Sequence, residues 1–191
     1  MASYRRAITG NCRTGHQATT RKTLGNSVVS KAEEKPAPNE ENGYLLEHAE
    51  LLCRSFEKLT GRALLDVHDD LSKLGEMLYR ADFVVVSHGI ELDPVFNYAN
   101  ETALKLFEMS WTEFVALPSR LSAEPVHQDE RVRLMQTVTA QGFIDDYAGI
   151  RISKSGKRFE IKSATVWNLF DEDDSYRGQA ATFAGWRFIE T

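Results

Sequence analysis

The sequence predicts an α+β domain in which helices cover one face of a five-stranded antiparallel sheet and an amphipathic helix precedes the core. Residues 83–89 form a short apolar run closed by glycine, as expected of a buried strand. Residues 93–124 combine a short strand with two consecutive helix starts. Residues 143–189 are rich in β-prone side chains and contain two polar turns. We expect the strand order 2-1-5-4-3, with the intervening helices packed on the sheet.

The length and composition are those of one globular domain with a tail. Of the 191 residues, 42% are hydrophobic and 27% are charged, which suffices for a single core. Residues 1–32 contain six basic and no acidic side chains, so residues 33–191 carry 17 basic and 28 acidic ones, a net charge of −11. Because an acidic body repels phosphate, we expect no nucleic-acid partner. No apolar run is long enough to span a membrane, and we expect no membrane association.

The N-terminal segment has the composition of an organelle transit peptide. Residues 1–32 are rich in Arg, Ser and Thr and lack the apolar run of a secretory signal. We expect import into the chloroplast; the alternatives are the mitochondrion, or a cytoplasmic protein with a disordered basic tail. Residues 31–43 are rich in charge and contain two prolines, as expected of a linker. We therefore assign residues 1–43 to a disordered transit peptide and linker, and residues 44–191 to the folded domain.

Two helices are expected within residues 44–80, ahead of a core at residues 83–189. The first carries an apolar stripe with steps of four, three, four and three residues and ends near Gly61. This stripe consists of Leu45, Ala49, Leu52, Phe56 and Leu59. Its spacing suits either packing on the chain's own domain or pairing with a second copy or another protein, so a homodimer helix is one alternative. A weaker stripe predicts a second helix over residues 71–79.

Capping signals mark the helices in the middle of the chain. Asn100 follows a short β-prone run and is a good N-cap for the helix after it. Ser110 and Glu113 have the spacing of a capping box, which predicts a second helix start. Gly142 follows a helical pattern over residues 127–141 and suits its C′ position.

The C-terminal part predicts three longer strands. Residues 143–153 and 158–170 flank a hairpin turn, and residues 176–189 form a last strand rich in small side chains. In the middle strand, alternation places one apolar set on a single face. This set is Phe159, Ile161, Thr165, Trp167 and Leu169. The small residues of the last strand would either leave room for a cavity or allow close helix packing.

Five collinear segments within residues 45–188 carry a resemblance to a known family. They are residues 83–89 (FVVVSHG), 93–100 (DPVFNYAN), 117–125 (LPSRLSAEP), 141–147 (QGFIDDY) and 177–183 (RGQAATF). The segments resemble a PAS domain and, more closely, the PAS-related MEKHLA family in a stand-alone form. The resemblance implies a sensory or protein-interaction module. In plants the domain also ends class III homeodomain leucine-zipper regulators, where it is thought to control dimerisation; this sequence contains neither a homeodomain nor a zipper, so a transcriptional role is not implied.

The resemblance also implies an interior that holds haem, flavin or a small metabolite in some members. Flavin-adduct chemistry requires a reactive cysteine, but residues 117–121 read LPSRL, with Ser119 at the nucleophile position. His88 and His127 are more typical of surface or capping residues than of haem ligands. No His, Cys, Asp or Glu set has the spacing of a metal site. We therefore predict no cofactor and no metal, and leave open an unidentified small ligand, non-covalent flavin included.

Catalysis is the less favoured class of function. Asp145 and Asp146 lie next to each other on a predicted strand, so their side chains point to opposite faces and cannot act as a pair. Ser119 has no His and Asp partners that the sequence places near it. We predict a non-catalytic sensory or protein-interaction module. The alternative is a small-molecule binding protein or enzyme that uses a pocket facing the sheet.

Seven polar or aromatic residues are candidates for that pocket. They are Asn97, Ser119, Arg120, Tyr147, Trp167, Gln179 and Thr182. The guanidinium of Arg120 would pair with an acidic group on a ligand. The alternatives are structural, because Arg120 could tie the turn at Pro118 to the strands and Trp167 could belong to the core.

Overall fold

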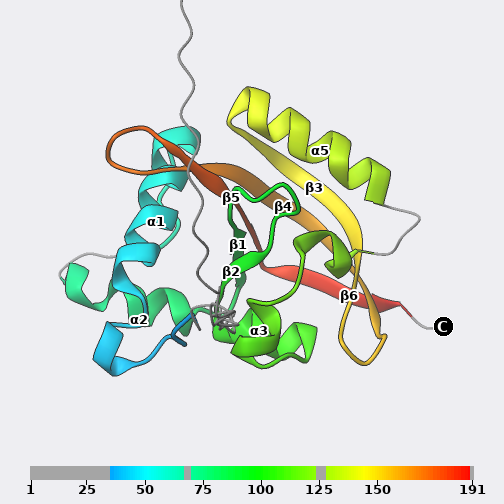
Figure 1. Ribbon diagram of the computed structural model, residues 1–191, viewed down its shortest axis with the longest axis horizontal. Helices are drawn as coiled ribbons and strands as arrows, with labels where there is room; N and C mark the ends of the chain where they lie inside the picture. The colour runs from blue at the N-terminus through cyan, green and yellow to red at the C-terminus, as the bar shows by residue number, and fades with distance from the viewer. Residues whose placement is uncertain (1–34, 67–69, 124–127, 190–191) are drawn as a thin grey trace, which may run out of the picture. The chain divides into compact units, whose positions relative to one another are not determined.

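The computed structural model describes residues 35–66, 70–123 and 128–189, and the predicted transit peptide lies outside them. Its centre is an antiparallel six-stranded sheet in the order β2-β1-β5-β4-β3, with β6 also paired to β4 (Figure 1). The strands are β1 (Val84–His88), β2 (Phe96–Ala99), β3 (Phe143–Ile152), β4 (Arg158–Phe170), β5 (Tyr176–Phe183) and β6 (Gly185–Ile189). The predicted order is confirmed. The expected last strand is interrupted at Ala184, and its two parts pair with different halves of β4.

Helices cover both faces of this sheet. They are η1 (Glu40–Asn42), α1 (Leu46–Thr60), η2 (Leu71–Lys73), α2 (Leu74–Tyr79), α3 (Glu101–Phe107), α4 (Trp111–Phe114), η3 (Ser119–Ser122) and α5 (Gln128–Gln141). Helices α1 and α2 pack in one apolar cluster with Val85, and α3 packs in another with Val84 and Val86. Since neighbouring strand residues point to opposite faces, the two clusters lie on opposite sides of the sheet. We call these sides the α1 face and the α3 face.

Two bulges face one another where β3 pairs with β4. Asp146 (φ 60°) lies in one and Ser163 (φ 53°) in the other, and the Ser163 hydroxyl donates a hydrogen bond to Asp146 Oδ1 at 3.1 Å. A bulge adds one residue to a strand and so reverses the side-chain alternation beyond it. In β4, Phe159 and Ile161 therefore point to the α3 face, whereas Trp167 points to the α1 face. The prediction that these side chains share one face is wrong for this reason.

The predicted caps of α3 and α4 are confirmed. Asn100 Oδ1 accepts a hydrogen bond from the backbone N–H of Ala103 at 3.1 Å, and Ser110 with Glu113 forms a capping box. Asn100 is also fully buried, and its Oδ1 accepts a second bond from the N–H of Val85 in β1 at 3.1 Å. One side chain thus both starts α3 and ties it to the central strand.

Residues 35–43, predicted to be part of a linker, contact the domain. The Trp111 indole donates a hydrogen bond to the carbonyl of Lys35 at 3.0 Å. Asn39 and Asn42 form a reciprocal capping box around η1. These polar side chains satisfy backbone groups of residues 39–42, so a segment with the composition of a linker is held on the domain.

The apolar stripe of α1 lies inside the domain. Leu52 is 0% and Phe56 5% exposed, and the Phe56 ring meets Trp167 edge-on with centroids 5.0 Å apart. Of the remaining stripe residues, Ala49 is buried, and Leu45 and Leu59 are partly buried against the same cluster. The helix ends at the predicted Gly61, whose φ is 70°. Because the sheet already covers this stripe, the alternative of a homodimer helix does not fit the packing.

A glutamate at position 52 tests this packing. Leu52→Glu places a charge in a fully buried site, so we expect the free energy of unfolding to fall by about 4 kcal/mol, or the chain not to fold. Leu92→Glu is the matched control, because Leu92 is fully exposed, and a change within about 0.5 kcal/mol is expected there. Urea denaturation measures both. A folded, monomeric Leu52→Glu protein beside a dimeric wild type would instead support the dimer helix.

Candidate ligand-binding site

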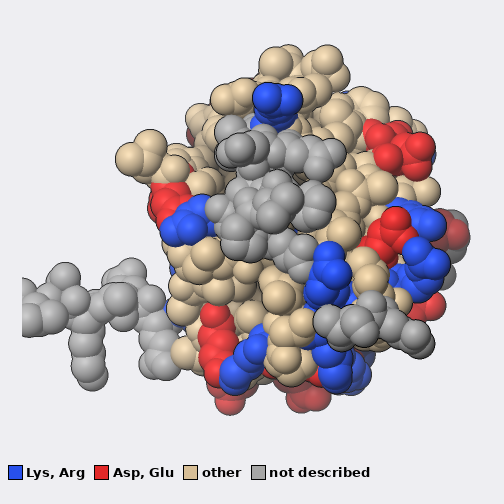
Figure 2. All heavy atoms as spheres, turned by 90° about the vertical axis from the view of Figure 1, so that its right-hand side faces the viewer, with Lys and Arg blue, Asp and Glu red and all other residues tan. Residues whose placement is uncertain are grey.

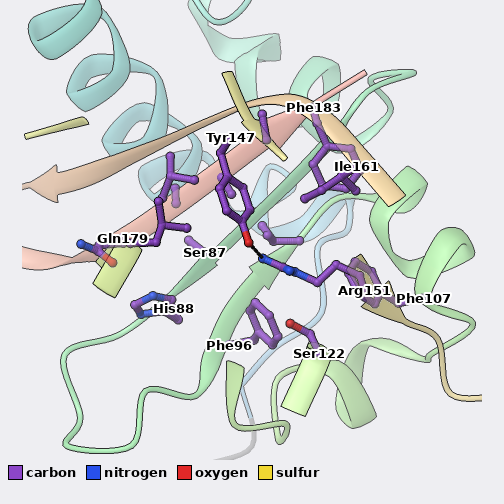
Figure 3. Close-up of a pocket in the computed structure, with 16 residues that line it drawn as sticks. Ser87, His88, Phe96, Phe107, Ser122, Tyr147, Arg151, Ile161, Gln179 and Phe183 are labelled. Carbon is purple, nitrogen blue, oxygen red and sulfur yellow. Dashed lines mark hydrogen bonds between the residues drawn. The ribbon is translucent and has the colours of Figure 1, made fainter. Parts of the chain in front are cut away.

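A cavity of about 50 Å³ lies between the α3 face of the sheet, η3 and α5 (Figure 3). We call it the central cavity. Its walls are mainly apolar and include Val86, Phe96, Phe107, Ile161 and Phe183. A space of this size holds a few water molecules or a very small organic molecule. Sites for larger ligands occupy roughly 300 Å³ or more, so a flavin or haem would not fit without displacement of these walls.

One charged side chain reaches into the central cavity from β3. Arg151 is 9% exposed, and its Nη2 donates a hydrogen bond to the Tyr147 hydroxyl at 3.2 Å (Figure 3). The guanidinium also lies 5.4 Å from the centroid of the Tyr147 ring. Gly149 lies between the two on the same face, and a Cβ there would overlap the Tyr147 hydroxyl. The glycine therefore lets the two long side chains meet.

A wider groove of about 450 Å³ adjoins the central cavity at the surface. His88 and Gln179 line both spaces, so they form part of the wall between them. Gln179 Nε2 donates hydrogen bonds to Thr139 Oγ1 of α5 at 3.1 Å and to Asn168 Oδ1 of β4 at 3.0 Å. A ligand entering from the groove would pass these side chains, which also hold α5 on the sheet.

Two of the seven predicted pocket residues, Tyr147 and Gln179, line the central cavity. Trp167 lies on the other side of the sheet because of the bulge in β4. Thr182 pairs with Val85 across β5 and β1 and shares its α1 face. Gln179 and Thr182 are three residues apart on one strand, so alternation alone already places them on opposite faces.

The other three predicted pocket residues lie outside the cavity lining. Ser119 is fully buried, and its N–H donates a hydrogen bond to the carbonyl of Pro94 at 2.7 Å. Arg120 Nε lies 3.0 and 3.2 Å from the two carboxylate oxygens of Asp93, so it has the structural role named as its alternative. Asn97 belongs to a network beside α1. These placements give the turn at residues 118–120 no contact with a ligand in the central cavity.

Four polar residues of the cavity, Ser87, His88, Ser122 and Arg151, are not among the predicted ones. His88, expected to be a surface or capping residue, is only 7% exposed. A signal for Arg151 was present, since it follows Tyr147 by four residues and shares its face on the predicted strand. No comparable signal marks Ser122, which a one-turn helix brings to the cavity. The arginine that reaches the cavity is therefore Arg151 and not Arg120.

A hydrogen-bonded network beside α1 contains a histidine and a serine but lacks the geometry of a catalytic pair. The Ser87 hydroxyl donates to Asn97 Oδ1 at 2.6 Å, and His48 Nε2 lies 2.9 Å from the same Ser87 oxygen. Because the serine hydrogen points to Asn97, His48 is the donor to Ser87 and not its base. Burial, and then the Lys35 ammonium, lower the pKa of His48 to about 4. The ring is therefore neutral near pH 7 and stacks on Tyr98 with centroids 5.2 Å apart.

Cys53 and Ser119 are the other reactive groups that we considered as nucleophiles, and both are shielded. Burial, and then the Glu57 carboxylate, raise the pKa of the Cys53 thiol to about 12, so the thiolate nucleophile is not populated at neutral pH. Within residues 35–66, 70–123 and 128–189, no three His, Cys, Asp or Glu side chains are grouped so that they could hold a metal ion. Ser119, at the position of a flavin-reactive cysteine, is enclosed away from the cavity.

Charges of both signs alternate on the face seen in Figure 2. Opposite charges also pair elsewhere in the described chain, as in Lys154–Glu113 at 2.6 Å and Arg187–Glu160 at 3.0 Å. Among the described residues coloured on this face, no basic stripe, the usual footprint of nucleic-acid binding, is visible. Among the helices described, none combines the length and apolarity needed to cross a membrane.

The model of the MEKHLA domain family matches residues 46–188. The chain belongs to the MEKHLA domain family. The homeobox-leucine zipper protein HOX9 of Oryza sativa subsp. japonica is 26% identical over 146 residues, which is 74% of this chain and 17% of HOX9. ATHB-14 of Arabidopsis thaliana, also named a homeobox-leucine zipper protein, is 30% identical over 99 residues, which is 50% of this chain and 11% of that protein. This MEKHLA chain thus spans less than a fifth of these relatives.

Solved structures show that this MEKHLA domain has a PAS-like fold. A PAS domain from Colwellia psychrerythraea superposes with a TM-score of 0.54 at 16% identity, covering 63% of this chain and 98% of that one. An RNA-binding light-oxygen-voltage receptor superposes with a TM-score of 0.51 at 11% identity, covering 61% of this chain and 32% of the receptor. Identities this low support the shared fold and nothing more specific.

The lowered pKa of His48 predicts acid sensitivity. Between pH 6.5 and about 4 the unfolded chain binds a proton at His48 that the folded chain does not, so stability falls as the pH falls through this window. The loss should approach about 3 kcal/mol near pH 4. His48→Gln keeps a donor for Ser87 and should show a flatter pH dependence in urea denaturation at pH 4.5, 5.5 and 7. Identical profiles for both proteins would contradict the assignment.

Proposed function

We propose that this MEKHLA domain is a non-catalytic sensory module that binds a small molecule in the central cavity. The observation that carries the proposal is the cavity itself, which is lined mainly by apolar side chains and contains a few convergent polar ones. That combination is typical of sites that bind small ligands. The polar groups are contributed by three strands and by η3, so they converge only in the folded domain.

Helix α5 is the element through which binding would alter the surface. Leu134 of α5 lines the cavity, and the Asn168 amide donates to the carbonyl of Val138 at 3.0 Å in the same helix. Gln179 joins this contact through its bonds to Asn168 and Thr139. A ligand that shifts Gln179 would change the bonds that hold α5 on the sheet. Ligand binding in the cavity would thereby change the position of α5 at the surface of the domain.

An enzyme is the less favoured function, because Ser87 and Cys53, like Ser119, lack the environment of an activated nucleophile. Ser87 directs its hydrogen at Asn97, and the raised pKa of Cys53 keeps its thiol protonated. Association with a protein partner remains part of the proposal as the output of a sensor. The α1 stripe is not its surface, since Leu52 and Phe56 are buried. We do not transfer to this chain the function that the name homeobox-leucine zipper protein implies for the plant relatives, because the chain spans only 17% of HOX9.

A cavity-filling substitution tests ligand binding. Ala164 is fully buried and lines the cavity, so Ala164→Leu should fill it and abolish binding. Native mass spectrometry of the purified wild type should show a bound small molecule, or a thermal-shift screen should find one, and Ala164→Leu should lose it. Ala184→Leu, at an exposed position between β5 and β6, is the control. A wild type that binds no compound, or binding that Ala164→Leu leaves unchanged, would overturn the proposal.

Chloroplast import is a separate proposal that rests on the composition of residues 1–32. Their six basic residues without any acidic one fit a transit peptide. A fluorescent protein fused behind residues 1–43 should accumulate in chloroplasts. A matched fusion in which the six basic residues are replaced by Gln should stay in the cytoplasm. Mitochondrial fluorescence, or cytoplasmic fluorescence of both fusions, would contradict chloroplast targeting.

A further inference from the structure

The central cavity contains a buried positive charge without a carboxylate partner among the described residues. Arg151 is 9% exposed and takes part in none of the ion pairs of that part of the chain. The acidic residues of the hairpin have other partners, since Asp145 pairs with Arg62 at 2.8 Å, Glu160 pairs with Arg187 at 3.0 Å, and Asp146 accepts a hydrogen bond from Ser163. The charge on Arg151 is therefore not balanced by its own strands.

The guanidinium also has donors left over. It uses Nη1 for the carbonyl of Ile150 at 3.0 Å and Nη2 for the Tyr147 hydroxyl at 3.2 Å. An arginine has five N–H donors, so three remain for another acceptor. Tyr147 accepts from Arg151, which leaves its own hydrogen free to be donated to the same acceptor. Both groups therefore present donors to the space they line (Figure 3).

A buried cation is unfavourable unless an anion or several acceptors offset its desolvation. Carboxylates match the planar guanidinium best, because two parallel N–H donors meet their two oxygens. The rest of the cavity is apolar and aromatic, with Phe96, Phe107 and Phe183 among its walls. Its volume of about 50 Å³ limits an occupant to a few heavy atoms.

We propose that the ligand of the central cavity is a short-chain monocarboxylate, held at its carboxylate by Arg151 and Tyr147 and at its alkyl end by the apolar wall. This inference rests on the proposed sensory function and adds the chemical class of the ligand. Gly149 is a positioning residue in this site, because it leaves the room in which Tyr147 and Arg151 meet.

The test compares acids with neutral molecules of the same shape. The full-length protein is titrated by calorimetry with acetate, propionate and butyrate, and with propionamide and butyramide, in a chloride-free buffer at constant ionic strength. At least one carboxylate should bind at least tenfold more tightly than its amide. Equal affinity of acid and amide, or no saturable binding of any of the three acids, would overturn the carboxylate assignment.

Arg151→Met keeps an apolar side chain of similar length and removes the charge. It should weaken carboxylate binding at least tenfold and leave any amide binding unchanged. Arg120→Met is the matched control, since Arg120 pairs with Asp93 outside the cavity, and it should bind like the wild type. Without ligand, the melting temperature of Arg151→Met should equal or exceed that of the wild type, because a buried uncompensated charge is gone.

The failures of the two proposals are distinguishable. If Arg151→Met binds carboxylates like the wild type, or if its melting temperature without ligand falls by several degrees, Arg151 has a structural role and the carboxylate proposal is wrong. If a neutral compound then binds and Ala164→Leu abolishes that binding, the sensory proposal stands alone. If Ala164→Leu changes no binding at all, both proposals fail.

Discussion

The facing bulges of β3 and β4 determine which side chains meet on each side of the sheet. The bulge in β4 reverses its alternation, so that Phe159 and Ile161 point to the α3 face and Trp167 points to the α1 face. Without the bulge, Phe159, Ile161 and Trp167 would all point to one face of the sheet. The α1 face would then lose Trp167, the largest fully buried side chain. The packing of the N-terminal helix and the lining of the cavity thus depend on the same bulge in β4. The hydrogen bond between Asp146 and Ser163 links this bulge to the bulge in β3.

Elements defined by a few neighbouring residues could be predicted from the sequence. The N-cap Asn100, the Ser110–Glu113 box and the C-terminal Gly61 all act within one helical turn, so their chemistry is visible in the order of residues. The bond between Asn100 and Val85 spans 15 positions and depends on how α3 docks on β1. The sequence therefore indicated where α3 starts but not what holds it to the sheet.

The candidate site was less predictable, because its residues are brought together by contacts between segments that are distant in the sequence. Tyr147 lines the cavity, whereas the bulge in β4 turns Trp167 to the other face of the sheet. Residues 162–164 contain no proline or glycine that would mark this bulge. Arg120 and Arg151 look alike in the sequence as isolated basic residues in partly apolar surroundings. Their roles differ because Asp93, 27 positions away, pairs with Arg120, whereas no acidic residue of the described chain forms an ion pair with Arg151.

The bare backbone at Gly149 has a consequence for the evolution of this family. A Cβ at this position would lie 2.4 Å from the Tyr147 hydroxyl oxygen, so the phenol would have to move from the place where it meets Arg151. Ligand chemistry could therefore diverge between members by one small substitution while the fold is retained. A glycine at the position of Gly149 would thus indicate a family member that can form the arginine–tyrosine pair. A larger residue there would indicate a member that cannot.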